Sequence, residues 1–357
     1  MGWETKRNLQ EKRPAFGRPP SARSGRSCIA ACRHRTFAAA DRPSMLSSAA
    51  WTWIGHGVTQ NSVGTTTLTY LEINGWLLSA AGTTILIDPV LEGNLDFGFP
   101  DLYDASKRVL PSTGLIETLP PLDALLITQG LDDHAHGRTL RRLAARMPEL
   151  RVFAPPSARA TVGLYFPRSA TYLASRSRRL DLPYLGLDAL PTVRLPPGKD
   201  TDRAQVKGIS IDATSGALVG PPWQRRENGY ILRMSDGAPS LYIEPHVEFD
   251  ADELAAKGPV DAVITPTSGQ SLPGFELVHG PRASADLVQA LRPRWVVPMG
   301  NGDVDARGVT SPLISPIGDQ EEFARRLANV RGQPPPPKVV DVSPGKPITL
   351  RRAPLST

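Results

Sequence analysis

Apolar and polar residues alternate along the chain from about residue 65, in the pattern of β-strands. The alternation and composition of Thr67–Ile73 are typical of a strand, and Asn74-Gly75 is the residue pair of a tight hairpin turn. Trp76–Leu78 continues as the return strand. The apolar run Thr84–Ile87 follows and is ended by Asp88-Pro89. This part of the chain therefore predicts an antiparallel start to a sheet.

From residue 124 the pattern changes to strands that alternate with helices. Ala124–Ile127 is a buried strand, and apolar residues recur at helical spacing between Leu140 and Met147. Further strands are predicted at Val152–Phe153, Gly208–Asp212, Tyr230–Arg233, Leu241–Ile243, Asp261–Ile264 and Arg294–Val297. Further helices are predicted at 157–164, at 282–291 and from Asp319, where Glu322 resembles a capping box. We expect an α/β fold of two sheets with helices outside.

The pattern predicts one folded domain over residues 63–330. No Gly-, Ser- or Pro-rich linker divides this range, although 91–120 is rich in Gly, Pro and Asp and is expected to be a long loop. The last residues, 331–357, contain four prolines at Pro334–Pro337 and are expected to form a tail that wraps around the domain or extends from it.

The first 62 residues have the composition of an organelle transit peptide and linker. They are rich in Arg, Ser, Ala and Pro, and they lack the apolar run of a secretory signal. The alternative is a disordered basic tail that stays attached. We expect an organelle location, with the chloroplast preferred to the mitochondrion, although composition does not separate the two.

The charge of the chain is concentrated in the same segment. Residues 1–45 carry a net charge of +7, so the remainder carries −1 of the total of +6. A domain without net positive charge has no bulk attraction for phosphates, which argues against a nucleic-acid partner. No stretch approaches the ~18 to 20 apolar residues of a membrane span.

Both cysteines, Cys28 and Cys32, also lie in the N-terminal segment. If that segment is removed, the mature protein has no disulfide, no cysteine nucleophile and no cysteine ligand for zinc. Any metal would then be held by His, Asp or Glu.

The densest group of chemically active side chains lies at 128–136, between a buried strand and a helix. Sites in α/β sheets are commonly built at this position. Asp133, His134 and His136 could face a cavity and bind a divalent metal. The alternative is that Asp132 or Asp133 caps the helix and that the histidines are polar residues of its first turn.

Two motifs in this order resemble the opening of the metallo-β-lactamase superfamily. Ile87-Asp88-Pro89 ends one strand, and Thr128-Gln129-Gly130-Leu131-Asp132-Asp133-His134 follows another, where the family has Thr-His-x-His-x-Asp-His. The branch most similar holds sugar-phosphate lactonases and N-acyl-phosphatidylethanolamine-hydrolysing phospholipases. The resemblance covers the 265 residues from Thr65 to Asn329. It implies a four-layer αββα sandwich of two mixed sheets, with metal-dependent hydrolysis.

The chain departs from the family at the first metal site. The first two motif histidines fall on Gln129 and Leu131, and the third should stand within Ala213–Gly216, which contains no histidine. A final histidine of the motif set should stand within Met299–Asn301 and is also missing. Each ligand of a structural zinc site is worth about 3 kcal/mol, so the resemblance implies no metal at the first site.

The second metal site keeps Asp133 and His134. Where the family has a bridging Asp, this chain has Glu244-Pro245-His246. The resemblance therefore implies either one divalent ion, Zn²⁺, Fe²⁺ or Mn²⁺, or none. The candidate ligands are Asp133, His134, His246 and Glu244, with Asp133 and His134 catalytic and Asp88 as structural support.

The loop at 220–230 falls where the family lines its substrate pocket. Trp223 offers an apolar wall, and Arg225 or Arg226 offers a fork for carboxylate or phosphate. The alternative is an ordinary strand connection in which the Trp fills the core. The expected pocket residues are Gln129, His136, Trp223, Arg225, Asn228 and Asn301.

Two functions remain open on the sequence. The first is a single-metal hydrolase that acts on an ester, lactone or phosphodiester of a small molecule in an organelle. The second is a metal-free family member that binds a ligand or serves as a scaffold. The substitutions at the first site are non-chelating, which favours the second function, whereas Asp133, His134, His136 and His246 favour the first.

Overall fold

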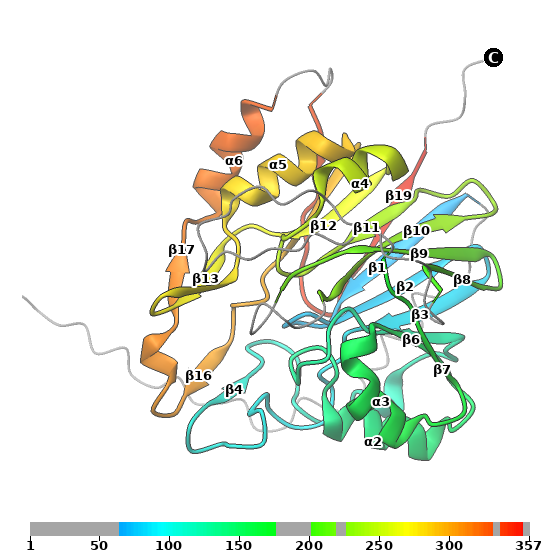
Figure 1. Ribbon diagram of the computed structural model, residues 1–357, viewed down its shortest axis with the longest axis vertical. Helices are drawn as coiled ribbons and strands as arrows, with labels where there is room; N and C mark the ends of the chain where they lie inside the picture. The colour runs from blue at the N-terminus through cyan, green and yellow to red at the C-terminus, as the bar shows by residue number, and fades with distance from the viewer. Residues whose placement is uncertain (1–63, 176–200, 219–225, 331–335, 353–357) are drawn as a thin grey trace, which may run out of the picture. The chain divides into compact units, whose positions relative to one another are not determined.

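Two seven-stranded sheets organise the structure, a computed structural model that describes residues 64–175, 201–218, 226–330 and 336–352 (Figure 1). The first sheet has the order β19 (Pro347–Arg351), β1 (Thr65–Tyr70), β2 (Trp76–Ala80), β3 (Thr83–Ile87), β5 (Ala124–Leu126), β6 (Arg151–Ala154) and β7 (Ala170–Tyr172). The second has the order β18 (Lys338–Val339), β15 (Trp295–Met299), β12 (Ala262–Pro266), β11 (Leu241–Ile243), β10 (Asn228–Met234), β9 (Ile209–Ser215) and β8 (Arg203–Val206).

The main core lies between the two sheets. Successive side chains of a strand point to opposite faces, so every second residue of β2 and β9 enters this core. Leu78 and Ile85 from the first sheet belong to one buried cluster with Ile211 and Leu232 from the second. The predicted sandwich is thereby confirmed at its centre.

Helices cover the outer face of each sheet. Leu77 and Leu86 of the first sheet pack with Leu140 of α2, and Val263 of the second packs with Leu287 of α5. The α-helices are α2 (Gly137–Arg146), α3 (Arg159–Tyr165), α4 (Ala251–Lys257), α5 (Pro281–Leu291) and α6 (Gln320–Ala328). The fold is the expected αββα sandwich (Figure 1).

Short elements complete the described chain. A three-stranded sheet has the order β14 (Phe275–Val278), β13 (Gly269–Leu272) and β17 (Ser315–Ile317), and β16 (Asp305–Arg307) pairs with β4 (Asp104–Ser106). The 3₁₀ turns are η2 (Ile116–Thr118), η3 (Pro156–Ala158) and η5 (Ser311–Leu313). The predicted loop at 91–120 thus contains one strand and one 3₁₀ turn. Within the described ranges, no helix combines the length and the apolar character of a membrane span.

The hairpin between β1 and β2 forms as predicted, but its turn is longer than an Asn-Gly turn. Tyr70 pairs with Trp76, so five residues connect the strands. The left-handed positions are Glu72 and Ile73, at φ of 65° and 56°, rather than Asn74. The carboxylate of Glu72 accepts hydrogen bonds from the backbone N–H groups of residues 108–110, which holds this loop. The turn therefore does not use the Asn74 side chain, which points toward His134 instead.

The described part of the C-terminal segment, which was expected to wrap around the domain or extend from it, adds a strand to each sheet. β18 pairs with β15 in the second sheet, and β19 pairs with β1 in the first. Leu350 of β19 is buried in the main core. The four prolines suggested a tail, whereas Ile348 and Leu350 alternate with polar residues and fit an edge strand.

Candidate metal centre

The parallel pairing of β3 with β5 brings two chain segments together at their carboxyl ends. Ile87 is paired with Leu126, and the Asp88 N–H donates to the Leu126 carbonyl over 3.0 Å. Asp88 then turns out of the strand with φ of 40°. The loop after β3 therefore meets the loop after β5. Functional sites commonly form at these carboxyl ends of parallel strands.

Asp88 is fully buried and binds its neighbours with both carboxylate oxygens. Its Oδ1 accepts the Thr128 N–H over 2.8 Å, and its Oδ2 accepts the Thr128 hydroxyl over 2.5 Å. The same Oδ2 lies 2.9 Å from Nδ1 of His134. With Nδ1–H donated to Asp88, Nε2 of His134 is left pointing toward the second sheet.

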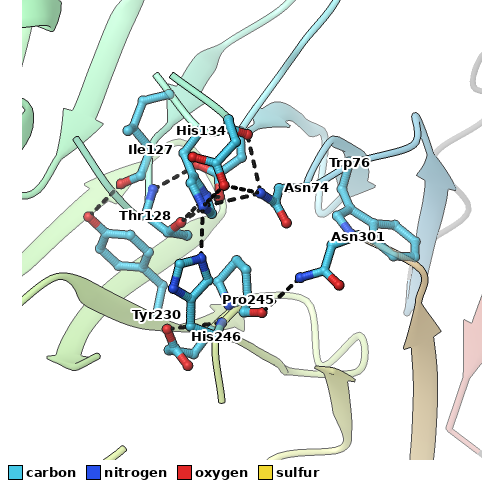
Figure 2. A network of polar contacts seen from close by, with 12 residues as sticks. Asn74, Trp76, Ile127, Thr128, His134, Tyr230, Pro245, His246 and Asn301 are labelled. Carbon is cyan, nitrogen blue, oxygen red and sulfur yellow. Dashed lines mark hydrogen bonds and ion pairs between the residues drawn. The ribbon is translucent and has the colours of Figure 1, made fainter. Parts of the chain in front are cut away.

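The second sheet contributes the other histidine. β11 ends at Ile243, and the next turn carries His246, which lies 112 residues after His134. The two Nε2 atoms are 3.3 Å apart, and Oδ2 of Asp133 lies 3.1 Å from Nε2 of His134 (Figure 2). The structure thus brings Asp133, His134 and His246 together, with one ligand atom from each within 4.8 Å of the others.

The charges of this cluster perturb its pKa values in opposite directions. Burial lowers the pKa of His134, but the carboxylates of Asp133 and Asp88 outweigh that effect and raise it to about 10. Burial and the neighbouring His134 together lower the pKa of His246 to about 3. Burial raises the pKa of Asp133, yet His134 brings it below its ordinary value. Two carboxylates and two imidazoles in one buried space are the surroundings expected for a bound cation.

Glu244, the fourth expected ligand, is used differently. Its two oxygens accept the backbone N–H groups of His246, at 3.3 Å, and Glu248, at 2.7 Å. Burial raises the pKa of Glu244 to about 7. The side chain therefore shapes the turn that carries His246, and it is not part of the three-residue cluster.

Several buried polar atoms around the cluster have no hydrogen-bond partner among the described residues. They are Oδ1 of Asp133, Nδ1 of His246, Oδ1 of Asn74, and both Oε1 and Nε2 of Gln129. An unpaired buried amide costs about 1–3 kcal/mol, so such atoms require an explanation. Unpaired buried donors and acceptors of this kind are expected where a ligand binds.

His136 lies outside this cluster, although it was expected in the pocket. It is buried at the N-terminus of α2, where its Nδ1 lies 2.8 Å from the Thr139 hydroxyl. Its Nε2 lies 3.3 Å from Nη2 of Arg138 and 3.9 Å from a carboxylate oxygen of Asp132. Burial lowers the pKa of His136. The first-turn alternative fits this position.

The other expected pocket residues are spread around the site. Asn228 is buried, and its amide donates to the Leu173 carbonyl and to the Tyr230 hydroxyl. Asn301 donates to the Pro245 carbonyl over 3.2 Å, beside His246 (Figure 2). Trp223 and Arg225 lie outside the described residues.

Two residues near the cluster could not be predicted from the sequence pattern. Asn74, interpreted as a turn residue, places its amide nitrogen 3.1 Å from Nε2 of His134. Glu227 is buried beneath the turn at Gly130, where it accepts the Ser157 hydroxyl, and burial raises its pKa to about 7. A hydrophobic–polar pattern could not distinguish either residue from an ordinary loop residue.

The first metal site of the family has no counterpart in the described ranges. Leu131 is 39% exposed and Ala213 is buried in the core. Among these residues, Asp133, His134 and His246 form the one group of three or more His, Cys, Asp or Glu side chains arranged to hold an ion.

The sequence of residues 67–300 matches the family model described as the beta-lactamase superfamily domain. The chain belongs to this superfamily. The match spans most of the sandwich, from β1 to the end of β15, and includes all three residues of the cluster. No curated protein matches the chain in sequence.

Solved structures of the metallo-β-lactamase fold are similar to this member at low identity. The metallo hydrolase Igni18 from Ignicoccus hospitalis is 16% identical with a TM-score of 0.50, covering 81% of this chain and 100% of its own. The diiron β-hydroxylase CmlA from Streptomyces venezuelae is 16% identical with a TM-score of 0.53, and the alignment covers 80% of this chain and 54% of CmlA. An isothiocyanate hydrolase from Delia radicum gut bacteria is 14% identical with a TM-score of 0.50, covering 80% and 99%. These likenesses establish the fold.

Proposed function

We propose that this protein is a single-metal hydrolase of a small-molecule ester, lactone or phosphodiester. The observation that carries the proposal is the convergence of Asp133, His134 and His246, whose ligand atoms lie within 4.8 Å of one another. Asp133 and His134 follow β5 of the first sheet, and His246 follows β11 of the second, so both segments are anchored to a strand. A metal site requires ligands held in a fixed geometry of this kind.

The spacing and the chemistry of the donors fit a divalent ion. Ligands about 2.0–2.1 Å from a tetrahedral ion are about 3.3 Å apart. The separations of 3.3 Å between the histidine nitrogens and 3.1 Å between Asp133 and His134 are close to this value. Two imidazoles and one carboxylate suit Zn²⁺, Fe²⁺ or Mn²⁺ with open positions.

When bound, such an ion lowers the pKa of a coordinated water toward ~7 and polarises the bond to be broken. The chain's own residues supply the rest. Asp88 fixes the ring of His134 through Nδ1, so that Nε2 faces the site. Oδ1 of Asp133 is buried and has no partner among the described residues, so it could accept a hydrogen bond from a water molecule or substrate group held beside such an ion.

We propose Gln129 as a residue that binds the substrate. It follows Thr128 at the mouth of β5, is fully buried, and has no partner for either amide atom within the described chain. An amide offers one acceptor and two donor hydrogens, which can orient a carbonyl or a phosphoryl group. This position holds a metal-binding histidine elsewhere in the family, so a substrate contact there is close to the ion.

The test is the metal content of the purified full chain after exposure to Zn²⁺, Fe²⁺ and Mn²⁺, measured by elemental mass spectrometry. We expect about one equivalent in the wild type and loss of the ion in His134→Ala and in His246→Ala. His136→Gln is the matched control, since it replaces a buried histidine outside the cluster, and it should retain the ion. A screen of esters, lactones and phosphodiesters would follow on the loaded protein.

The second candidate is a metal-free protein that binds a small ligand. It is favoured by the non-chelating Leu131 and by the absence of a histidine from Ala213–Gly216, where the family has metal ligands. If the wild type and His134→Ala both bind less than ~0.1 equivalent of every ion, the hydrolase proposal fails and this candidate remains. Thermal-shift screening with small carboxylates and phosphates would then be the next measurement.

We also propose that residues 1–62 direct the protein to an organelle, the chloroplast before the mitochondrion. The support is the basic, Ser- and Ala-rich composition of this segment, which lies outside the described residues. A fluorescent protein fused to residues 1–62 should enter the organelle, and a cytosolic distribution of the fusion would contradict the proposal.

A further inference from the structure

The loop between β1 and β2 carries Asn74 into the metal centre. Glu72 and Ile73 adopt left-handed backbone conformations, and Glu72 is held by three backbone N–H groups of the 108–110 segment. Asn74 is only 2% exposed as a result. Figure 2 shows its side chain directed at His134.

The amide of Asn74 contacts two of the three candidate ligands. Its nitrogen lies 3.1 Å from Nε2 of His134 and 3.2 Å from Oδ2 of Asp133, and it also lies 3.2 Å from the Asp133 carbonyl. Its oxygen is buried and has no hydrogen-bond partner among the described residues. The amide nitrogen is therefore satisfied by the ligands, whereas the amide oxygen has no partner in the described part of the chain.

The distances place the amide where a further ligand would stand. Ligands of a divalent ion with bonds of about 2.0–2.1 Å are separated by about 3.3 Å. The distances from the Asn74 amide to His134 and Asp133 match those among the ligand atoms themselves. Rotation of the side-chain amide by about 180° exchanges its nitrogen and oxygen, which have nearly the same shape.

We infer that Asn74 is a fourth protein ligand of the divalent ion, bound through Oδ1. This inference rests on the proposed metal site. Without the ion, Nδ2–H groups occupy the lone pairs of Asp133 and hold the ligands in place. With the ion, rotation gives the buried oxygen its missing partner.

A fourth protein ligand also restricts the kind of ion. Four protein ligands close a tetrahedral zinc site, whereas five- or six-coordinate ions keep open positions for water and substrate. Oxygen ligands from an amide and a carboxylate suit the harder ions. A catalytic site with Asn74 bound therefore favours Mn²⁺ or Fe²⁺ over Zn²⁺.

The test compares Mn²⁺ affinity in the full-length wild type, Asn74→Leu and Asn74→Asp by isothermal titration. Loss of one of four ligands should weaken binding about 100-fold in Asn74→Leu, whereas the new carboxylate of Asn74→Asp should bind at least as tightly as the wild type. Asn94→Leu is the matched control, since the Asn94 amide oxygen accepts the Ser112 hydroxyl instead. The visible spectrum of the Co²⁺-loaded proteins gives a second measurement, because its intensity depends on coordination number.

Equal affinity and an unchanged Co²⁺ spectrum in Asn74→Leu would overturn the inference and leave the metal site standing. Thermal unfolding in chelator would show whether Asn74→Leu folds. If it does not, the Mn²⁺ affinity of Asn74→Asp is the test, and a large loss of affinity in that variant would also overturn the inference. If the wild type binds neither Mn²⁺ nor Co²⁺, the proposed function fails together with the inference.

Discussion

Oδ2 of Asp88 lies 2.9 Å from Nδ1 of His134, and both side chains are fully buried. The two residues are 46 positions apart and meet because β3 and β5 are parallel neighbours. This contact sets the ring orientation of His134 and contributes to its raised pKa. It links the Ile-Asp-Pro motif of the sequence to the metal centre.

Asp88→Asn should weaken metal binding about 10- to 100-fold. An amide carries no negative charge, and it has one acceptor oxygen where the carboxylate of Asp88 uses two. The pKa of His134 should also fall. Dissociation constants measured by chelator competition would check the first effect, and NMR titration of the histidine the second. Asp123→Asn is the control, since Asp123 accepts the Thr84 N–H at the opposite end of β3. Equal affinities in both variants would exclude the orienting role.

Glu227→Gln should change how stability depends on pH. Burial raises the pKa of Glu227 from 4.5 to about 7, so the folded state binds this proton more tightly than the unfolded chain. The contribution is fully present below pH ~4.5 and is lost as the pH rises through ~7, and the total loss of stability is about 3 kcal/mol. The variant should therefore gain stability relative to the wild type between these values.

Urea unfolding of the wild type and Glu227→Gln at pH 5, 6 and 8 would measure that difference. Glu321→Gln is the control, because the side chain of Glu321 is 88% exposed and its removal should leave the curve unchanged. Parallel curves for the wild type and Glu227→Gln would show that Glu227 is not held in a protonated form by the fold.

Tyr230→Phe should destabilise the protein by about 1–2 kcal/mol. The Tyr230 hydroxyl on β10 donates to the Ile127 carbonyl over 3.0 Å, which joins the second sheet to the loop that follows β5 of the first. The same hydroxyl accepts from Asn228 over 2.9 Å. Denaturant unfolding would measure the loss, with Tyr172→Phe as a half-buried tyrosine control expected to change by less than about 0.5 kcal/mol. A change of the same size in both variants would argue against the inter-sheet bond.

Gly130→Ala should disturb the turn between Thr128 and His134. A Cβ at Gly130 would lie 2.9 Å from the backbone carbon and oxygen of Ser157, which cannot move as a side chain can. We expect a loss of about 1–3 kcal/mol in stability and weaker metal binding. Gly137→Ala at the start of α2 is the control. The nearest heavy atom to a Cβ at this position would be the Tyr165 hydroxyl oxygen at 3.6 Å, and a helix favours Ala. Equal stability of the two variants would contradict the close approach.

Local pattern was enough for most of the fold. The apolar run at 124–127 and the helical spacing after Leu140 correspond to β5 and α2, and the helix predicted at 282–291 is α5 (Pro281–Leu291). The helix expected from Asp319 begins there, with the Asp319 side chain accepting the Glu322 N–H. Period and capping are properties of neighbouring residues, so they can be recognised without a structure.

The sequence by itself determined the alternation that builds two sheets, the order of the family motifs and the loss of the first-site histidines. Tertiary structure decided the rest of the site: it brought His246 to His134 across the two sheets, turned the oxygens of Glu244 to backbone N–H groups, and directed Asn74 at the ligands. The physical reason is the separation along the chain over which each kind of interaction acts. Strand and helix preferences act between neighbours in the chain, whereas coordination depends on distances of about 3 Å between segments far apart in sequence, and only packing sets those distances.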